Sequence, residues 1–423
     1  KTTMNITNPY TGKVIEKVPN CTQKDVNKAV SYAEKAQKKW AKVPVHQKVE
    51  LVNKFLDLVQ ENRNDLAKTL CVETGKPITQ AFAEIDNVKI SFTAFSERAK
   101  HLYGAVIPAG TEAGQENTLQ FTQREPLGVI GVIIPFNLPI DLFDQKVAPA
   151  LLAGNAVVIK PPHQNPSTII KLVALMLQAG FPSGVVQVLT GDGLKTGNAI
   201  TKHPKVHGIS FTGSIAVGKS VYKNASEHFA HITLELGGND PFILLDDADI
   251  DLAVEEVVWG RMYNAGQVCV ASKRFIVDKK VVKEFEIKVV ERLKKLVVGN
   301  PLDKKTDIGT LVTLQAAEKV EKQVKNIVNQ GGKILYGAKR EGATYFPTVI
   351  TNIPASADVA KDDEVFGPVV SIIPVDNMEE AVKVANQSNH GLGSCVFTRD
   401  MKKAFKIANS MEAGGCVING ASF

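Results

Sequence analysis

From residue 129 onward, short apolar runs alternate with segments of helical pattern, and this alternation limits the possible folds more than any other feature. Apolar runs occur at 129–134, 156–160, 185–190, 207–212 and 241–245. Helix-like segments lie between them, at about 166–180, 194–203 and 216–228. Strands and helices at this spacing predict an α/β fold with a parallel, doubly wound sheet. Ligands of such sheets bind beyond the carboxyl ends of the strands.

The alternation continues in the second half, which predicts a further α/β unit. Strands are expected at 274–278, 369–375 and 394–398, and helices at 281–296, 314–330, 379–388 and 401–412. The first hundred residues instead carry apolar residues at helical spacing, over 23–62 and 76–103, until glycine and proline interrupt the pattern at 104–114.

The length of 423 residues exceeds what one ordinary core holds, so two domains are expected. A boundary at Gly237-Gly238 is the natural division. Residues 1–236 would then hold the N-terminal helices and a Rossmann-type dinucleotide-binding domain, and residues 237–423 an α/β catalytic domain that carries the thiol.

Charge and cysteine usage exclude several classes of protein. The 50 Lys and Arg residues against 44 Asp and Glu give a net charge of +6 without any block of like charge, so no nucleic-acid partner is predicted. No stretch of 18 apolar residues occurs, so no membrane partner is predicted. The 5 cysteines form no CxxC pair. This count predicts neither a disulfide framework nor a metal site, and it favours a cytoplasmic protein.

Three residues supply the parts that acyl chemistry needs. Cys269 follows a flexible Gly-Gln-Val segment, Glu235 stands in an apolar segment before two glycines, and Asn137 lies between two prolines after an expected strand. A nucleophile, a base and an amide donor would together support covalent catalysis. Each also has a purely structural interpretation: a buried small apolar side chain, a turn carboxylate and a turn amide. The three residues alone do not decide between these interpretations.

Two glycine-rich segments are candidates for phosphate binding. The segment 213–220 satisfies the Walker A pattern, and 242–246 is similar to a Walker B strand, so a P-loop NTPase is the rival enzyme class. A P-loop favours slim residues because its backbone N–H groups must approach the phosphates. Ile215 and Val217 are bulky, which argues against this class. The segment 191–197 is one residue too long for GxGxxG and is a weak dinucleotide signal.

Taken together, the motifs resemble those of the aldehyde dehydrogenase superfamily, in the order in which that family carries them. The matching segments are Pro135-Phe136-Asn137-Leu138-Pro139 for PWNFP, Lys160-Pro161 for the KP strand end, 180–185 for GxPxGV, 211–214 with Gly218 for FTGSxxxG, 235–238 for ELGG, 266–269 for GQxC and 364–368 for ExFGP. The FTGSxxxG match explains the Walker A pattern.

The resemblance implies NAD(P)+-dependent oxidation of an aldehyde to a carboxylate. Cys269 would be the nucleophile that forms a thioester, and Asn137 with the backbone N–H of Cys269 would stabilise the oxyanion. Glu235 would be the general base that hydrolyses the thioester, and its presence argues against transfer to coenzyme A. Lys146 matches a lysine that the family carries shortly after the PWNFP motif, in the active-site region.

The resemblance also implies a binding site for NAD or NADP. Lys160, Ser214 and Glu364 would hold the nucleotide, with Glu364 on the nicotinamide ribose, and Gly193 and Gly213 would permit close backbone approach. The full set of implied contacts is Ile134, Pro135, Phe136, Lys160, His163, Gly193, Phe211, Gly213, Ser214, Val217, Leu236, Gly237, Glu364 and Phe366.

His163 stands where NAD-preferring members often carry glutamate, three residues after the lysine of the KP motif. A glutamate there would repel the 2′-phosphate of NADP, whereas a histidine would not. The sequence therefore predicts that NADP is accepted.

The substrate positions lack the cations of succinate-semialdehyde relatives. Tyr263 and Gln145 replace two arginines, so the charge-assisted clamp for a second carboxylate is missing. The pattern of the chain is nearest to lactaldehyde-type members, which predicts a small hydroxyaldehyde. Sulfolactaldehyde or succinate semialdehyde are the alternatives, and a non-catalytic family member is an alternative from a different class.

The chain ends at Phe423, before the substrate-loop motif and the oligomerisation strand that the family normally carries. We therefore expect this C-terminal tail to be absent from the chain, and the full-length protein to be a homodimer or homotetramer.

Overall fold

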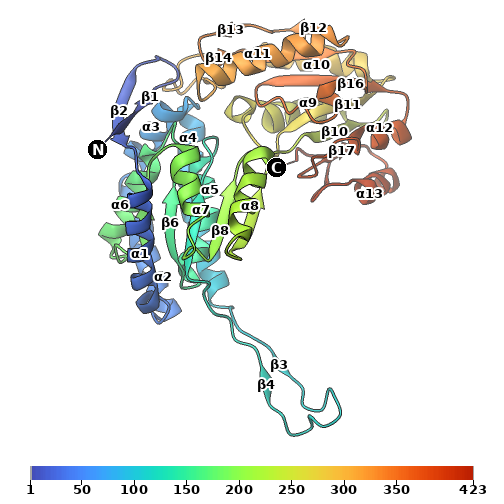
Figure 1. Ribbon diagram of the computed structural model, residues 1–423. Helices are drawn as coiled ribbons and strands as arrows, with labels where there is room; N and C mark the ends of the chain where they lie inside the picture. Colours follow the sequence, from blue (N-terminus) through green and yellow to red (C-terminus); the bar gives the residue numbers. More distant parts are fainter. Residues whose placement is uncertain (1, 423) are drawn as a thin grey trace.

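A five-stranded parallel sheet is built from the first half of the chain in the computed structural model, which describes residues 2–422 (Figure 1). Its order is β7-β6-β5-β8-β9. The strands are β5 (Val129–Ile133), β6 (Ala156–Lys160), β7 (Val186–Val188), β8 (Gly208–Thr212) and β9 (His231–Glu235). The chain runs outward from β5 to β7 and then returns to β8 beside β5. The β5–β8 pair is thus the topological switch point, where such sheets bind ligands.

Helices cover both faces of this sheet because both faces are apolar. Val157 and Ile159 of β6 belong to one core cluster, whereas the alternate residues Ala156 and Val158 belong to another. The helices are α1 (Gln23–Trp40), α2 (Val45–Glu61), α3 (Arg63–Thr74), α4 (Ile78–Ala99), α5 (Pro139–Leu152), α6 (Ser167–Ala179), α7 (Asn198–Thr201) and α8 (Ile215–Ser226).

A second sheet of seven strands forms the other half, in the order β12-β15-β16-β11-β10-β17-β18, with β12 antiparallel to its neighbour. The strands are β10 (Asp240–Leu244), β11 (Ser272–Asp278), β12 (Lys333–Tyr336), β15 (Thr348–Thr351), β16 (Val369–Val375), β17 (Cys395–Phe397) and β18 (Val417–Ile418). The helices are α9 (Ile250–Val257), α10 (Val282–Leu293), α11 (Leu314–Asn329), α12 (Met378–Ala385) and α13 (Met401–Ser410), with a short 3-10 turn η4 (Asp358–Ala360). Only residues 236–239 separate β9 from β10.

Several elements differ from the sequence-based prediction. The helical pattern over 23–62 corresponds to two helices, α1 and α2, and Pro44 between them lacks the N–H that a continuous helix requires. The helix expected over 194–203 begins as the π-helix η1 (Gly193–Gly197). Strand β9 and the N-terminal hairpin of β1 (Thr3–Thr7) and β2 (Val14–Pro19) were not predicted, because their exposed polar residues mask the strand pattern.

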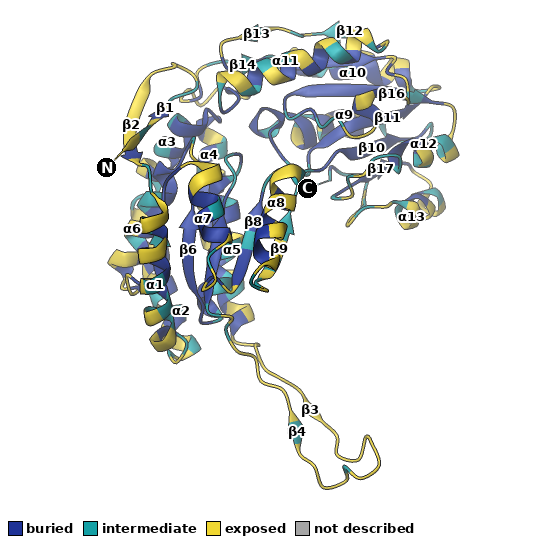
Figure 2. Ribbon diagram, in the orientation of Figure 1, coloured by how far each residue is buried: buried dark blue, intermediate teal, exposed yellow. Residues whose placement is uncertain are grey.

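The glycine- and proline-containing break at 104–114 is one arm of a long hairpin rather than a plain loop. Strands β3 (Val106–Ile107) and β4 (Gln120–Phe121) pair within it, and the hairpin extends far from the rest of the molecule (Figure 1). Nearly all of it is exposed (Figure 2). A smaller hairpin of β13 (Arg340–Glu341) and β14 (Thr344–Tyr345) lies in the second half. Within residues 2–422, no helix combines the length and apolar character that crossing a membrane requires.

Candidate active site

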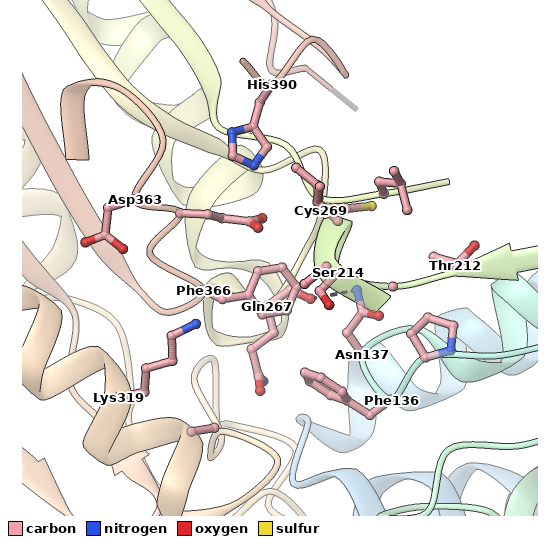
Figure 3. A pocket seen from close by; sticks show the side chains of 18 of the residues that line it. Phe136, Asn137, Thr212, Ser214, Gln267, Cys269, Lys319, Asp363, Phe366 and His390 are labelled. Carbon is pink, nitrogen blue, oxygen red and sulfur yellow. Dashed lines mark hydrogen bonds between the residues drawn. The ribbon is translucent and has the colours of Figure 1, made fainter. Parts of the chain in front are cut away.

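A cavity of about 670 Å³ lies where loops from the two sheets meet. Its lining includes most of the residues singled out by the motifs: Pro135, Phe136, Asn137, Gly213, Ser214, Glu235, Leu236, Gly237, Cys269, Glu364 and Phe366. Figure 3 shows these segments converging from both halves of the chain. The loops that follow β5, β8 and β9 form one wall, as expected for the carboxyl edge of a parallel sheet.

Cys269 and Glu235 both line this cavity and lie close enough for each to shift the pKa of the other. Glu235 ends β9, and Cys269 lies just before β11. Burial raises the pKa of the Cys269 thiol to about 12, and the nearby Glu235 carboxylate adds to this increase. Burial also raises the pKa of Glu235, while the neighbouring Cys269 thiol opposes that increase. A carboxylate with a raised pKa beside a thiol suits proton transfer near neutral pH.

The short segment before Cys269 has an unusual backbone. The π-helix η2 (Val258–Met262) leads into the 3-10 turn η3 (Tyr263–Gly266), in which Asn264 and Ala265 have φ of 51° and 52°. Gly266 follows with φ of 74°, and a side-chain carbon there would lie 2.3 Å from the carbonyl oxygen of Gly367. The glycine of the GQxC motif is therefore required for both conformation and space.

Asn137 is buried at the end of the loop after β5. Its side-chain amide donates to the carbonyl of Gln267 at 3.0 Å, two residues before Cys269. Its own carbonyl accepts from Lys76 Nζ at 3.0 Å and from the amide of Asn264 at 2.8 Å. Because a side-chain amide has two N–H bonds, one remains after the bond to Gln267.

Lys76 and Glu84, which no motif indicated, hold the segment of Asn137 in place. The two side chains are fully buried and form an ion pair. Glu84 also accepts from the backbone N–H of Ile140 at 2.8 Å, at the start of α5. Removing one partner of a buried pair leaves an uncompensated charge, so the pair fixes the Asn137 loop firmly. Charged residues in loops and on amphipathic helices normally face solvent, so no sequence pattern indicated this buried pair.

Lys146 does not line the cavity, but it lies close enough to influence the catalytic pair. Burial lowers the pKa of Lys146, and the neighbouring Glu235 and Cys269 oppose this effect. The structure thus places a cation behind the thiol and the carboxylate, on helix α5.

The first turn of α8 faces the cavity as an anion site. Ser214 is the N-cap of this 12-residue helix, and its hydroxyl accepts from the N–H of Val217 at 3.4 Å. Free N–H groups at a helix N-terminus favour phosphate. Phe211 is buried and its ring packs directly against Gly213. A side-chain carbon on Gly213 would lie 2.6 Å from that ring.

The opposite wall of the cavity is shaped by Glu364 and Phe366. Phe366 packs edge-to-face on Phe136, with ring centroids 6.1 Å apart. A side-chain carbon on Gly237 would lie 2.5 Å from Oε2 of Glu364, so only glycine leaves the carboxylate in place. A large cavity bounded by a helix N-terminus and by the half-buried carboxylate of Glu364 has the groups that a dinucleotide would need at its phosphates and at its ribose hydroxyls.

Lys160 and His163 lie outside the cavity, beyond the carboxyl end of β6. Burial lowers the pKa of Lys160 to about 8. Burial and the charge of Lys160 lower the pKa of His163, and Asp192 opposes both shifts. Asp192 caps η1 by accepting from the backbone N–H groups of Leu194 and Lys195.

The other predicted contacts that do not line the cavity are Ile134, Gly193 and Val217. Ile134 is buried and hydrogen-bonds the backbone of Lys160, Gly193 begins η1, and Val217 is exposed in the first turn of α8.

The second half contributes cavity residues that no motif indicated. Helix α11 presents Ala316, Lys319, Val320 and Gln323 at helical spacing, and Figure 3 shows Lys319 extending toward the cavity. Asp362, Asp363, Asn389 and His390 complete this side. Helical periodicity predicted α11 but could not reveal that these residues line a cavity shared with loops of the other half. Within residues 2–422, no three His, Cys, Asp or Glu side chains are grouped closely enough to hold a metal ion.

Comparison with known proteins identifies relatives over the whole chain. The model of the aldehyde dehydrogenase family matches residues 1–423. A lactaldehyde dehydrogenase of Methanococcus aeolicus is 38% identical, with 98% of this chain and 88% of the relative covered. A 3-sulfolactaldehyde dehydrogenase of Priestia aryabhattai is also 38% identical, with 99% of this chain and 87% of the relative covered.

Solved structures agree with this relationship. A glyceraldehyde-3-phosphate dehydrogenase of Methanocaldococcus jannaschii, complexed with NADP, has a TM-score of 0.94 at 37% identity, covering 99% of this chain and 91% of that one. A betaine aldehyde dehydrogenase of Staphylococcus aureus, in complex with NAD+, has a TM-score of 0.95 at 34% identity, covering 100% and 87%. The α/β fold and the family predicted from the motifs are therefore confirmed, and the P-loop alternative is excluded. The chain belongs to the aldehyde dehydrogenase family, whose members use NAD or NADP.

Proposed function

We propose that this protein oxidises a small hydroxyaldehyde, such as lactaldehyde, to its carboxylate with NAD+ or NADP+. The observation that carries this proposal is that Cys269, Glu235 and Asn137 line the same cavity, with Glu235 close enough to Cys269 to shift its pKa. Nucleophile, base and oxyanion donor are the groups that an aldehyde dehydrogenase needs.

The catalytic roles follow from the positions of these groups. The sulfur of Cys269 adds to the aldehyde carbon, and the free N–H of Asn137 with the backbone N–H of Cys269 stabilises the oxyanion. The nicotinamide of the bound cofactor supplies the hydride acceptor. Glu235 then takes a proton from water, which hydrolyses the thioester on Cys269. Lys146 keeps a positive charge near both groups and so favours their ionised forms.

The cofactor would lie along the carboxyl edge of the five-stranded sheet. We place its phosphates at the N-terminus of α8 near Ser214, and its nicotinamide ribose on Glu364. Lys160 and His163 would meet the adenosine ribose, where no carboxylate at position 163 repels a 2′-phosphate. These assignments support use of NADP as well as NAD.

The substrate proposal rests on the groups around Tyr263. Burial and the carboxyl groups of Glu84 and Asp141 raise the pKa of Tyr263 above its ordinary value. Burial raises the pKa of Asp141 to about 7. Carboxyl groups near this position favour a neutral aldehyde over a sulfonate or a second carboxylate. Sulfolactaldehyde remains the second candidate, because a relative of 38% identity is named for it.

The test is a panel of aldehydes with NAD+ or NADP+, followed by absorbance of the reduced cofactor. The panel contains lactaldehyde, glycolaldehyde, glyceraldehyde, sulfolactaldehyde and succinate semialdehyde. We expect the highest kcat/KM with a neutral hydroxyaldehyde, and no reduction with Cys269→Ala. A higher kcat/KM for sulfolactaldehyde or succinate semialdehyde would reject the substrate, and activity that survives in Cys269→Ala would reject the mechanism.

The domain division, assembly and location complete the proposal. We divide the chain into a cofactor domain of residues 1–236 and a catalytic domain of residues 237–423, because the two sheets are joined only through residues 236–239. The exposed β3–β4 hairpin supports assembly into a homodimer or homotetramer. Within the described residues no disulfide joins any of the five cysteines, which supports a reducing compartment such as the cytosol.

A further inference from the structure

Lys273 is a buried cation that contacts both the backbone of Cys269 and the carboxylate of Glu364. It lies in β11, four residues after Cys269, and its side chain is fully buried. Its Nζ donates to the backbone carbonyl of Cys269 at 2.6 Å and to that of Ala271 at 3.3 Å. The same Nζ lies 3.3 Å from Oε1 of Glu364 and 5.9 Å from the ring centroid of Phe366. One ammonium group therefore joins the nucleophile to the proposed cofactor carboxylate.

The charges that face Lys273 explain why it stays ionised in the interior. Burial lowers the pKa of Lys273, whereas the carboxylates of Glu364 and Asp240 raise it, followed by Cys269. The nearby Arg261 lowers the pKa of Lys273, and the buried Arg274 shares the carboxylate of Asp240 with Lys273. A buried ammonium is retained only when carboxylates and carbonyl groups compensate its charge. Glu364 supplies the nearer part of this compensation, so its position determines how strongly Lys273 acts on the thiol.

Arg261 holds the backbone of residues 365–369, which follow Glu364, through two hydrogen bonds. Its side chain is fully buried and donates to the carbonyls of Val365 and Val369 at 2.7 Å each. These bonds hold the backbone that follows Glu364, while the carboxylate itself is held by Lys273. The carboxylate is therefore free to change partner without a change in the backbone.

We propose that Lys273 is a positioning residue that couples the cofactor side of the cavity to the reactivity of Cys269. This inference rests on the proposed function, in which Cys269 is the nucleophile and Glu364 holds a ribose. While Glu364 pairs with Lys273, the positive charge is shared and the thiol stays protonated. When Glu364 turns to ribose hydroxyls, the charge of Lys273 acts more fully on Cys269 and favours the thiolate.

The test measures the thiol in the cofactor-free protein, with no aldehyde present. Alkylation by iodoacetamide is followed at several pH values below the thiol pKa, and Cys269 is identified among the cysteines by peptide mass spectrometry. The variants are Lys273→Met, Lys273→Arg, Glu364→Gln and the double variant Lys273→Met/Glu364→Gln. The Cys269 thiol first loses its proton to water, and the thiolate then forms an S–C bond with iodoacetamide and displaces iodide.

Lys273→Met removes the cation, so we expect the thiol pKa to rise by about one pH unit. The thiolate fraction then falls about tenfold and the greater intrinsic reactivity of the thiolate offsets part of this, so alkylation slows about threefold. Glu364→Gln removes one compensating carboxylate, while Asp240 and the carbonyls of Cys269 and Ala271 still keep Lys273 charged. We therefore expect it to accelerate alkylation by a similar factor. Lys273→Arg keeps the charge and restores a rate near that of the wild type.

The double variant separates coupling from a general disturbance of the structure. Glu364→Gln should accelerate alkylation less once Lys273 is methionine, because only the direct effect of the carboxylate on the thiol then remains. An equal acceleration in both backgrounds would overturn the proposal. If Lys273→Met does not fold, Glu364→Gln and Lys273→Arg still decide it, since Glu364→Gln without acceleration is incompatible with a shared charge.

Lys279→Met is the matched control, because Lys279 is an exposed lysine just after β11 whose ion pair is with Asp376. Its alkylation rate should equal that of the wild type. The proposed function and the proposed coupling through Lys273 can be rejected independently. A wild type that oxidises no aldehyde rejects the proposed function, whereas an active wild type with an unchanged thiol in Lys273→Met rejects only the coupling.

Discussion

Asn137 illustrates how much of one residue's role depends on contacts that lie far away in the sequence. Its amide is oriented by Gln267 and its carbonyl by Lys76 and Asn264. The motif around Asn137 was recognisable from local sequence, as were Cys269 and Glu235. The supporting residues were not, because their partners come from other elements and no local pattern indicates a buried charge.

Asn137→Ala is expected to lower kcat by about 10²–10³-fold, because one oxyanion donor is lost. The substrate KM should change little, since the donor acts mainly on the charge that develops in the reaction. The measurement is steady-state kinetics on the best aldehyde of the panel. Lys76→Met provides a comparison: it should also lower kcat, through misplacement of Asn137. A change confined to KM in Asn137→Ala would contradict the oxyanion role.

His163→Glu is expected to reduce kcat/KM for NADP at least about tenfold relative to NAD, because the new carboxylate faces the 2′-phosphate. His163→Gln removes the imidazole without adding a charge and should keep NADP activity. Both variants are measured with each cofactor at a saturating aldehyde concentration. Equal cofactor ratios in all three proteins would show that residue 163 does not face the adenosine ribose.

At the scale of elements, the alternation of apolar runs and helices predicted the central strands well. Strands β5, β6 and β8 agree because continuous Val and Ile runs have few alternatives when both faces are buried. Strand β9 was missed because it is an edge strand with polar residues. The missed strand matters functionally, since β9 carries Glu235 to the cavity.

The turn η3 was also beyond sequence reasoning, because no rule predicts left-handed Asn264 and Ala265 in succession. Gly266→Ala is expected to destabilise the protein by about 3 kcal/mol and to abolish most activity, because the added carbon would meet Gly367 at 2.3 Å. Gly342→Ala is the matched control: its φ is 58° but nothing lies within 4 Å of the added carbon. It should cost only about 1 kcal/mol. Thermal unfolding and cofactor reduction give both quantities, and equal effects of the two substitutions would contradict the steric explanation.

At the scale of the whole molecule, the β3–β4 hairpin has exposed apolar residues that contacts within one chain do not explain. Val106, Leu119 and Phe121 are 72%, 78% and 64% exposed on it. Exposed apolar residues on a long two-stranded arm indicate contact with another chain, because an isolated hairpin is only marginally stable. The sequence predicted an interruption here but not an arm, since its apolar residues do not alternate in a long strand pattern.

The double variant Val106→Lys/Phe121→Lys is expected to shift the protein toward the monomer in analytical ultracentrifugation, because charges cannot be buried cheaply in an apolar contact. Phe405→Lys on α13 is the control, since Phe405 is a similarly exposed aromatic residue outside the hairpin. Alkylation of Cys269 reports whether the cavity stays intact in each variant. An unchanged assembly in the double variant would show that the hairpin has another role.

The four residues between β9 and β10 form a natural point for recombination between related enzymes. The proposed base precedes them and the proposed nucleophile follows them, so the proposed catalytic pair spans the connection between the two sheets. A chimaera of two relatives recombined within 236–239 would take its base from one parent and its thiol from the other. Cofactor choice and thiol chemistry are thus inherited on separate segments, and a new combination of them remains functional only if this connection holds the two sheets at the same angle.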